Sequence, residues 1–308
     1  MTEKPEDHLA GEPQFSTAFD PAYGDAVDVA PGIFRVTANN PSHFTFTGTN
    51  SYVGGDGATC FVIDPGPADA AHLAALKKAV GTRNVDAVLL THTHSDHSAS
   101  AMQFAAEVSA PLLGARLGNA GGNPLDAPPV GEIVYARHLE DGETLRVGGH
   151  SVEVVATPGH ASDHVALALK DKAILFSGDH VMAWSTPVVA PPDGSMGDYM
   201  ASLERLLPRS ETRYLPGHGG PVERPLAFVR GLIHHRRMRE ASILKRLDAE
   251  DQTIEAIVAA SYPGLDPRLV GAAGASVLAH LVDLQSRGLV ASETDTNGTA
   301  HYRLLTRK

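Results

Sequence analysis

Cysteine and aromatic residues are scarce in this chain of 308 residues, and long apolar runs are missing. A single cysteine, Cys60, cannot form an intramolecular disulfide, so the fold is not held together by such cross-links. No stretch approaches the roughly 20 continuous apolar residues that cross a bilayer, so we expect no membrane span. The N-terminus is charged and lacks the apolar segment of a secretory signal, and together these absences predict a cytoplasmic protein.

Basic charge is also in short supply. The chain has 25 Lys and Arg against 36 Asp and Glu, which gives a formal net charge of −11. This balance disfavours non-specific binding to nucleic acid or to an anionic membrane, although it leaves room for a local basic groove. Histidine is abundant, with 16 residues, while aromatic residues make up 6% of the chain. These proportions fit a metal-binding protein better than a binding module lined with aromatic side chains.

The pattern of apolar segments predicts a tail, a large α/β domain and a small C-terminal domain. Residues 1–25 are rich in Pro, Glu and Asp, which predicts a flexible tail. In residues 26–225 short apolar strands alternate with helices, and 117–129 is a Gly-, Pro- and Asn-rich loop. We expect strands at 32–36, 50–54, 60–64, 85–90, 151–156, 164–169, 173–177 and 213–215, and helices at 68–80, 99–106 and 198–207.

Residues 226–308 predict three helices followed by a hairpin. Thr253 and Asp266 are suitable N-caps for the second and third helices. The dipeptide Asn297-Gly298 is typical of a hairpin turn. The order of these elements indicates a winged-helix domain. The expected helices are 228–249, 253–261 and 266–288, and the expected strands are 289–292 and 301–305.

The segment THTHSDH is the most informative part of the chain. It offers imidazole nitrogens and a carboxylate, which hold zinc and related divalent metals. The apolar run before it predicts a buried strand, and α/β sheets place ligand sites at the carboxyl ends of strands. Along an extended segment His92 and His94 share one side, while Asp96 and His97 point elsewhere as the chain turns into a helix. One short segment can therefore supply two adjacent metals.

Three later segments repeat the order of strand end, Gly turn and potential ligand. They bring His160, Asp179 and His218 to the ends of three expected strands. Glycine at these turns lets the backbone approach a metal closely. A lone His or Asp after a strand is usually a surface or capping residue. Three of them in this order, after the HxHxDH element, predict one shared metal site.

These motifs resemble those of the metallo-β-lactamase-fold hydrolase superfamily over roughly residues 27–225. The resemblance implies an α/β fold of the αββα sandwich type with a site for two divalent metals. We expect Zn²⁺, with Mn²⁺ or iron as alternatives that the ligand set also suits. Matched position by position, it implies one metal on His92, His94 and His160, a second on Asp96, His97 and His218, a bridging Asp179, and catalytic roles for Asp96, His97 and Asp179.

The same resemblance implies roles for residues around the ligands. Asp64, in the VIDPG turn, matches a carboxylate that orients a ligand, although a turn-forming Asp before Pro-Gly explains it equally well. His164 and His180 are candidates for moving a proton, and a structural role is the favoured alternative for both. Three loop residues either line the substrate cleft or serve packing: Thr49, Asn50 and Trp184.

The implied chemistry is hydrolysis, because two divalent metals acidify a bridging water toward hydroxide and stabilise the developing oxyanion. The winged-helix ending most resembles the lactamase-β-like protein 2 branch, whose better-studied members imply cleavage of single-stranded RNA. We therefore expect a phosphodiesterase or endoribonuclease-like enzyme that acts on a small molecule or on single-stranded RNA. A glyoxalase II-like thioesterase, or another ester or lactone hydrolase, is the first alternative.

A nucleic-acid-binding protein with a vestigial hydrolase domain is the second alternative. The expected recognition helix, however, carries only Arg268 and Arg287 as cations, too few for a helix that reads phosphates. We therefore expect no specific DNA binding and no membrane partner, and we interpret the winged helix as a structural element or a lid near the active site. The basic run 234–239 either meets a phosphate-bearing substrate or forms a solvated helix face.

Overall fold

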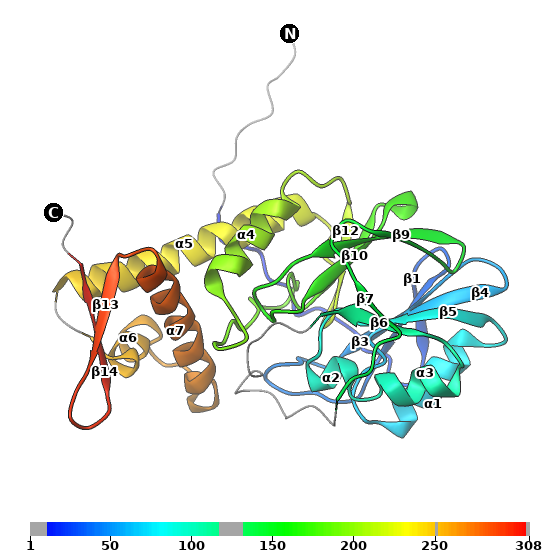
Figure 1. Cartoon of the computed structure of the whole chain (residues 1–308), viewed down its shortest axis with the longest axis horizontal. Coiled ribbons are helices and arrows are strands. Elements are labelled where there is room, and N and C mark those ends of the chain that lie inside the picture. The colour runs from blue at the N-terminus through cyan, green and yellow to red at the C-terminus, as the bar shows by residue number, and fades with distance from the viewer. Residues whose placement is uncertain (1–10, 117–131, 250–251, 306–308) are drawn as a thin grey trace, which may run out of the picture.

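The computed structural model describes residues 11–116, 132–249 and 252–305 (Figure 1). It has a sandwich of two sheets between helices and, beside it, a smaller helical unit that ends in a hairpin. The long helix α5 (Pro225–Ala249) runs from one unit to the other. The loop predicted at 117–129 lies outside the described residues, as do residues 1–10 of the predicted tail.

The first sheet of the described chain contains seven strands, which are hydrogen-bonded in sequence order. The first four pair antiparallel, whereas β4, β5, β6 and β7 are parallel neighbours. The strands are β1 (Ala26–Ala30), β2 (Ile33–Thr37), β3 (Asn50–Gly54), β4 (Thr59–Ile63), β5 (Asn84–Leu89), β6 (Leu112–Ala115) and β7 (Arg137–Leu139).

The second sheet has the order β12-β11-β10-β9-β8. Both β9 and β11 pair antiparallel with β10, and β12 pairs parallel with β11. The carboxyl ends of β9, β11 and β12 therefore lie at the same edge of the sheet. The strands are β8 (Thr144–Val147), β9 (His150–Ala156), β10 (Val165–Leu169), β11 (Ile174–Gly178) and β12 (Arg213–Pro216), with a 3-10 turn at Lys170–Lys172.

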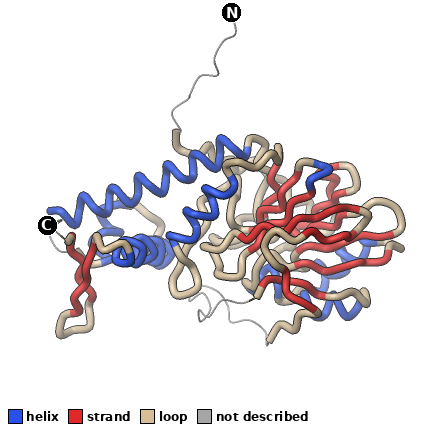
Figure 2. The backbone as a smooth tube through the Cα atoms, turned by 45° about the horizontal axis from the view of Figure 1, so that its top comes forward, coloured by secondary structure: helices blue, strands red, loops and turns tan. Residues whose placement is uncertain are grey.

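The two sheets pack face to face around an apolar interior that includes Phe61, Leu167 and Phe176. Fully burying a side chain of this size contributes about 1.5–3 kcal/mol. Helices cover the outer faces: α1 (Ala70–Val80) and α3 (Ala101–Glu107) pack on the first sheet, and α4 (Met196–Leu206) and α5 on the second (Figure 2). The expected αββα sandwich is confirmed.

Helix starts follow local chemistry. The carboxylate of Asp69 accepts from the backbone N–H of Ala71 at 2.8 Å and caps α1, so the helix starts at Ala70, two residues after the expected start. The short helix α2 (Ser95–Ser98) lies between β5 and α3 and contains the second half of the THTHSDH segment. The predicted helix at 99–106 corresponds to α3.

The C-terminal unit has the predicted winged-helix order. Thr253 caps α6 (Ile254–Ser261) by accepting from Ala256 N, and Asp266 accepts from Arg268 N at the 3-10 turn Pro267–Leu269. The unit ends with α7 (Val270–Ser286) and the antiparallel pair β13 (Val290–Thr294) and β14 (Ala300–Leu304). Its own apolar core consists of Ile243, Leu247, Ile257, Val258, Val277, Leu281, Leu284, Val290 and Tyr302.

Helix α5 begins at Pro225, beside the expected division at residue 226, and contributes to the cores of both units. Val229 and Leu232 in its first half pack with the helix layer of the second sheet. Ile243 and Leu247 in its second half enter the winged-helix core. A single uninterrupted helix therefore fixes the position of the C-terminal unit relative to the sandwich.

Residues 11–25 were expected to be part of a flexible tail, but the structure places them against the folded chain. The ring of Phe15 meets that of Phe228 edge-on with centroids 5.8 Å apart, and Ser16 N donates to Ala183 O at 2.9 Å. Glu12 Oε2 lies 2.6 Å from Nδ1 of His235. The segment is polar overall, but it contains aromatic side chains at intervals, such as Phe15, that pack against the folded chain.

By length and composition, one helical stretch among the described residues is apolar enough to cross a membrane, namely Pro267–Ser286. In this fold one face of that stretch fills the winged-helix core through Val277, Leu281 and Leu284. The stretch also contains His280 and Asp283, so it is not a continuous apolar run.

Candidate metal centre and adjoining cavity

The turns predicted to carry ligands meet at one edge of the sandwich. His92 and His94 follow β5, Asp96 and His97 lie in α2, and the other three predicted ligands follow β9, β11 and β12. Space at this edge is tight: a Cβ on Gly217 would lie 2.3 Å from Asp179 Oδ1 and 2.6 Å from His97 Cε1. Glycine is needed there because the backbone touches two of the potential ligands. The structure thus brings together all seven residues proposed as ligands.

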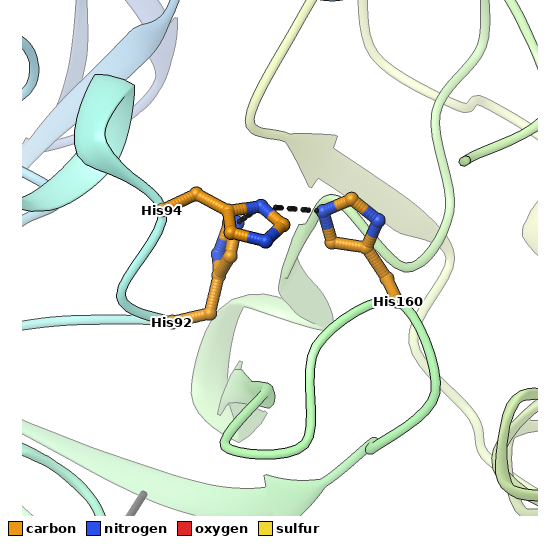
Figure 3. A group of neighbouring side chains, drawn as sticks. All are labelled: His92, His94 and His160. Atoms are coloured by element: carbon orange, nitrogen blue, oxygen red, sulfur yellow. Dashed lines mark hydrogen bonds between the residues drawn. The ribbon is translucent and has the colours of Figure 1, made fainter. Parts of the chain in front are cut away.

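Three histidines form the first group of converging donors (Figure 3). Nε2 of His92 and Nε2 of His160 lie 3.0 Å and 2.9 Å from Nδ1 of His94. His160 donates its Nδ1–H to the carbonyl of Val188 at 2.6 Å, which leaves the lone pair of Nε2 pointing into the group. One N–H on His94 cannot serve both neighbours at once, so at least one ring nitrogen of the group keeps a lone pair that faces the others.

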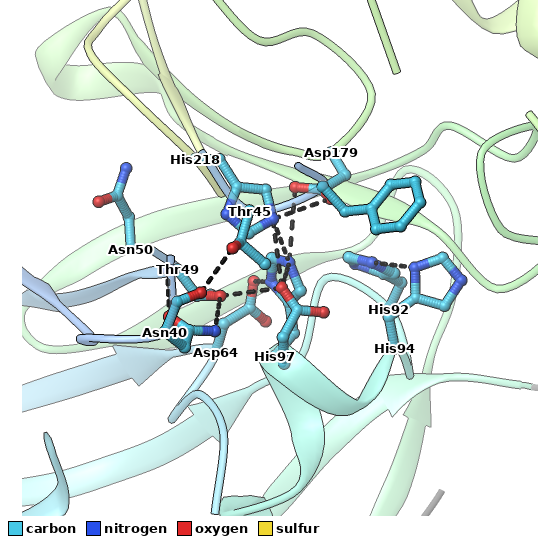
Figure 4. Close-up of polar contacts among 12 residues, drawn as sticks. Asn40, Thr45, Thr49, Asn50, Asp64, His92, His94, His97, Asp179 and His218 are labelled. Carbon is cyan, nitrogen blue, oxygen red and sulfur yellow. Dashed lines mark hydrogen bonds and ion pairs between the residues drawn. The ribbon is translucent and has the colours of Figure 1, made fainter. Parts of the chain in front are cut away.

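Asp96, His97 and His218 form the second group (Figure 4). Nε2 of His218 lies 3.3 Å from Nε2 of His97 and 3.2 Å from Oδ2 of Asp96. The outer ring nitrogens of both histidines face oxygen acceptors, Asp64 Oδ2 at 2.9 Å and Gly48 O at 3.2 Å. These contacts keep a donor hydrogen on the outer nitrogen of each ring, so the inner nitrogen is the one that can bind a metal once it has lost its proton.

Asp179 lies between the two groups. Its Oδ2 is 3.2 Å from Nε2 of His218 and 3.6 Å from Nε2 of His160, and its Oδ1 is 3.5 Å from Nε2 of His97. One carboxylate therefore reaches a histidine of each group. Its Oδ1 is buried without a hydrogen-bond partner in the described part of the chain, which a bound cation would remedy.

The donor set fits divalent metal ions. The ligand atoms within each of three overlapping groups lie within 4.8 Å of one another, the groups being His92–His94–His160, His92–His97–Asp179 and Asp96–His97–His218. Zinc–nitrogen bonds of about 2.0–2.1 Å in tetrahedral geometry separate neighbouring donors by about 3.3 Å, close to the distances above. Imidazole with carboxylate is also a chemically suitable mixture for zinc, iron and manganese.

Burial keeps the first group neutral. It lowers the pKa of His92 and His94 below the usual histidine value and that of His160 to about 4. Only neutral imidazole binds a metal, so these three side chains need no deprotonation near pH 7.

The second group behaves in the opposite way. Burial alone would lower the pKa of His97 and His218, but the carboxylates of Asp96 and Asp179 outweigh it. The pKa of His97 rises well above its usual value, and that of His218 rises to about 9. Burial alone would raise the pKa of Asp96 and Asp179, yet the two histidines hold the pKa of both carboxylates below the usual range. The two carboxylates thus favour positive charge in this group, which either protons on the histidines or bound metal ions can provide.

Asp64 and Thr91 brace the site from behind. Asp64 accepts from the backbone N–H and the hydroxyl of Thr91, at 2.8 Å and 2.7 Å, as well as facing Nδ1 of His97. Thr91 Oγ1 is also 3.0 Å from Nδ1 of His92. Asp64 thus holds the ring of His97, a contact that agrees with the role the resemblance implied. Thr91 received no role from the sequence, although its place at the start of THTHSDH was a usable signal.

His164 and His180 are placed as structural residues. Nε2 of His164 accepts from the backbone N–H of Asp179 at 3.1 Å, and its Nδ1 pairs with Thr157 Oγ1 at 2.8 Å. His180 is fully buried, and its ring packs against that of Tyr199 with centroids 4.7 Å apart. Burial lowers the pKa of His164 well below its usual value and that of His180 to about 3, so neither is suited to exchange a proton near neutral pH.

The three residues proposed for the cleft divide between two places. Thr49 and Asn50 are fully buried instead of lining a cleft. Thr49 donates to Asp96 Oδ2 at 2.8 Å, and Asn50 donates to the carbonyls of Pro216 and Gly219. They hold a ligand and the His218 loop because they lie where β3 meets that loop. Trp184 does line the cavity beside the metal centre, where it stacks on Phe46 at 5.0 Å.

A cavity of about 490 Å³ adjoins the metal centre. Its walls come from the sandwich, from the segment before β1, from α5 and from the winged-helix unit. Apart from the potential ligands, the lining is mainly apolar and aromatic, with four basic residues, His43, His235, Arg236 and Arg239. Its members include Phe15, Phe44, Met182, Trp184, Val188, His235, Arg236, Arg239, Tyr262, Leu265, Leu269, Ala272 and Ala273.

The winged helix therefore forms one wall of the cavity, as expected of a unit near the active site. Most of these lining residues were not predicted from the sequence. They come from distant segments and carry no motif, and only the basic run on α5 gave a signal.

Comparison with known proteins agrees with this architecture. Residues 44–218 match the metallo-beta-lactamase superfamily, and residues 253–299 match the beta-lactamase-associated winged helix domain. A Drosophila melanogaster protein described as a beta-lactamase-like protein 2 homolog is 31% identical over 83% of this chain and 88% of its own length. An atrochrysone carboxyl ACP thioesterase of Cryptosporiopsis sp. is 29% identical over 79% of this chain and 70% of its own.

A solved structure shows the same fold over nearly the whole chain. The beta-lactamase domain protein from Burkholderia ambifaria superposes with a TM-score of 0.79 at 23% sequence identity, covering 95% of this chain and 97% of the other. The shared fold thus includes both the sandwich and the winged-helix unit.

Proposed function

Because the chain belongs to the metallo-β-lactamase superfamily of hydrolases, we propose that it is a metal-dependent hydrolase of small organic esters or thioesters. The observation that carries this proposal is the cavity of about 490 Å³ beside the candidate metal centre, whose walls are mainly apolar. Such a space suits the acyl part of a small molecule. The fungal relative described as an ACP thioesterase supports the same class of substrate.

We further propose that the site holds two divalent cations, most suitably zinc. His92, His94 and His160 would hold one, Asp96, His97 and His218 the other, and Asp179 both. When bound, such a pair supplies Lewis acidity that activates water at neutral pH and stabilises charge on the substrate oxygen.

Other residues of the chain hold the potential ligands and shape the space for the substrate. Thr49 holds Asp96 through a hydrogen bond of 2.8 Å, and His164 holds the backbone of Asp179. Val188 turns its carbonyl to His160 and also lines the cavity, so one loop aligns both a ligand and the substrate wall. The apolar wall excludes water from the side of the substrate that does not react.

Phosphodiester cleavage is the second candidate, and Arg236 and Arg239 at the cavity favour it. A polynucleotide needs a groove with many cations, however, and the formal net charge of the chain is −11. Both arginines of the expected recognition helix are already paired, Arg268 with Asp266 at 2.6 Å and Arg287 with Glu240 at 2.6 Å. We therefore rank a small-molecule substrate above single-stranded RNA and propose no specific DNA binding.

The test is a hydrolysis panel on metal-reconstituted protein. It contains S-butanoyl-N-acetylcysteamine, 4-nitrophenyl butyrate, bis(4-nitrophenyl) phosphate and a single-stranded RNA oligonucleotide. We expect the thioester or the ester to have the highest kcat/KM. Efficient cleavage of RNA or the phosphodiester, with no action on either acyl substrate, would reverse the ranking.

A further inference from the structure

Arg236 is a buried cation without a carboxylate partner. Its side chain lies on α5, is 4% exposed and faces the cavity. One nitrogen donates to the carbonyl of Pro187 at 2.5 Å, and the guanidinium lies 5.1 Å from the centre of the Tyr199 ring. Its Nε has no hydrogen-bond partner, and no ion pair joins it to a carboxylate in the described ranges. A buried charge in this condition is costly unless something of opposite sign approaches it.

Arg239 follows one helical turn later and faces the same cavity. Its guanidinium lies 4.6 Å from the centre of the Tyr262 ring, and it too has no ion pair within the described chain. Tyr262 holds this side chain at the cavity wall, so both cations are presented to the same space.

The two basic residues that flank Arg236 on α5, in contrast, have carboxylate partners. Arg237 is not part of the cavity lining and pairs with Glu204 at 2.9 Å, and His235, which does line the cavity, faces Glu12 at 2.6 Å. The carboxylates that line the cavity, Asp96 and Asp179, are engaged by histidines at the metal centre. The described chain therefore places a carboxylate against Arg237 and against His235, but none against Arg236 or Arg239.

We propose that Arg236 and Arg239 bind an anionic group of the substrate, a carboxylate or a phosphate, at a distance from the bond that is cleaved. The substrate then has three parts: a scissile acyl bond at the metal centre, an apolar body along Leu265 and Leu269, and an anionic end on the two guanidinium groups. Paired guanidinium groups suit both oxyanions. This inference rests on the proposed function for the first part only, because the anion site exists independently of catalysis.

A binding experiment tests the anion site without turnover. Trp184 lines the cavity and is the one tryptophan of the chain, so its fluorescence reports binding there. The probes are 4-phenylbutyrate, its neutral amide and 3-phenylpropyl phosphate, titrated into metal-loaded and chelator-treated full-length protein. We expect at least one anion to bind about tenfold or more tightly than the amide in both forms. Carboxylate and phosphate probes then show which oxyanion the site prefers.

Variants assign the effect to the arginines. Arg239→Gln is the main variant because its side chain is only partly buried, and Arg236→Lys is the second because it retains charge at the buried position. Arg239→Gln should remove most of the preference for anions, and Arg236→Lys should weaken it. Arg237→Gln, on the same helix but outside the cavity, is the matched control and should retain it. Equal binding of anion and amide by the unmodified protein, or an unchanged preference in Arg239→Gln, overturns the proposal.

Kinetics separate this inference from the proposed function. The monoester 4-nitrophenyl glutarate and its methyl ester differ only in the distal carboxylate, and S-butanoyl-4′-phosphopantetheine differs from S-butanoylpantetheine only by its phosphate. A higher kcat/KM for the anionic member, lost in Arg239→Gln, supports the inference. Hydrolysis of all four without such a preference refutes the anion site alone. Anion binding without hydrolysis of any acyl substrate refutes the proposed function alone.

Discussion

Asp179 lies between the two groups of potential ligands, since its carboxylate reaches His97, His160 and His218. Replacing it by Ala should leave the fold intact, because the side chain lies at the edge of the sandwich beyond β11. The expected result is loss of bound metal and a fall in kcat of about two orders of magnitude or more. Elemental analysis, circular dichroism and the best acyl substrate measure these effects. Full metal content and activity in Asp179→Ala would refute the bridging role.

Gly217 offers a sharper test of how tightly the site is built. A methyl group there would lie 2.3 Å from Asp179 Oδ1, so Gly217→Ala must displace a ligand. Gly220, three residues later, has its nearest atom at 3.6 Å and accepts a methyl group without strain. We expect Gly217→Ala to lose at least about tenfold in metal affinity while Gly220→Ala retains it. Competition with a chromophoric chelator measures both. Equal affinities would show that the backbone approach is unimportant.

Proton release on metal binding follows from the raised pKa values of His97 and His218. Without metal both side chains remain protonated at pH 7, because the pKa of His218 is about 9 and that of His97 lies well above the usual value. Metal must displace these protons, so affinity should rise with pH from about 6 to about 8. Calorimetry in buffers of different ionisation enthalpy counts the protons. A pH-independent affinity with no proton release would show that the two histidines are already neutral.

At the scale of elements, most of the longer buried strands were predictable, whereas β1, β7, β8 and the short buried strand β6 were not. The prediction of residues 50–54 coincides with β3, whose five residues are all buried. In contrast β7 has one buried residue in three, and β8 is only four residues long. Their hydrogen bonds depend on neighbouring strands, so the sequence of the segment alone carries little information about them.

Helix α7 contains a buried histidine that makes acid stability testable. Burial, with Arg236 as the next cause, lowers the pKa of His280 to about 3 from 6.5 in an unfolded chain. Below about pH 6.5 the unfolded state therefore binds a proton that the folded state rejects, and stability falls as the pH falls. Between pH 6.5 and pH 5 this effect is about 2 kcal/mol.

We expect His280→Leu to unfold with a smaller loss of stability between pH 7.5 and pH 5 than the unmodified protein. Neither ring nitrogen of His280 has a hydrogen-bond partner in the described chain, so leucine costs no such bond. Urea titrations at both pH values measure the difference, and His138→Leu on the exposed part of β7 is the control. An identical pH dependence in His280→Leu and the unmodified protein would show that His280 is not held neutral.

At the scale of the whole molecule, the convergence of the potential ligands was predictable and the cavity was not. Each ligand follows a strand and a short motif, so parallel strand ends determine where the ligands meet. The cavity instead depends on how Phe15, Trp184, Arg239 and Tyr262 are brought together from distant parts of the chain. That arrangement results from the length and direction of α5, which a pattern within one segment cannot report.

The same arrangement makes the winged-helix wall testable without truncation, which would cut or expose the shared helix α5. Ala272 on α7 lines the cavity, whereas Val282 on the same helix is 46% exposed and does not. Ala272→Trp should fill part of the substrate space, lowering kcat/KM at least about tenfold while leaving metal content unchanged. Val282→Trp adds similar bulk outside the cavity and should leave both unchanged. If Ala272→Trp retained normal kcat/KM on the best acyl substrate, the winged helix would not shape the substrate site, and the apolar wall could not account for the choice of substrate.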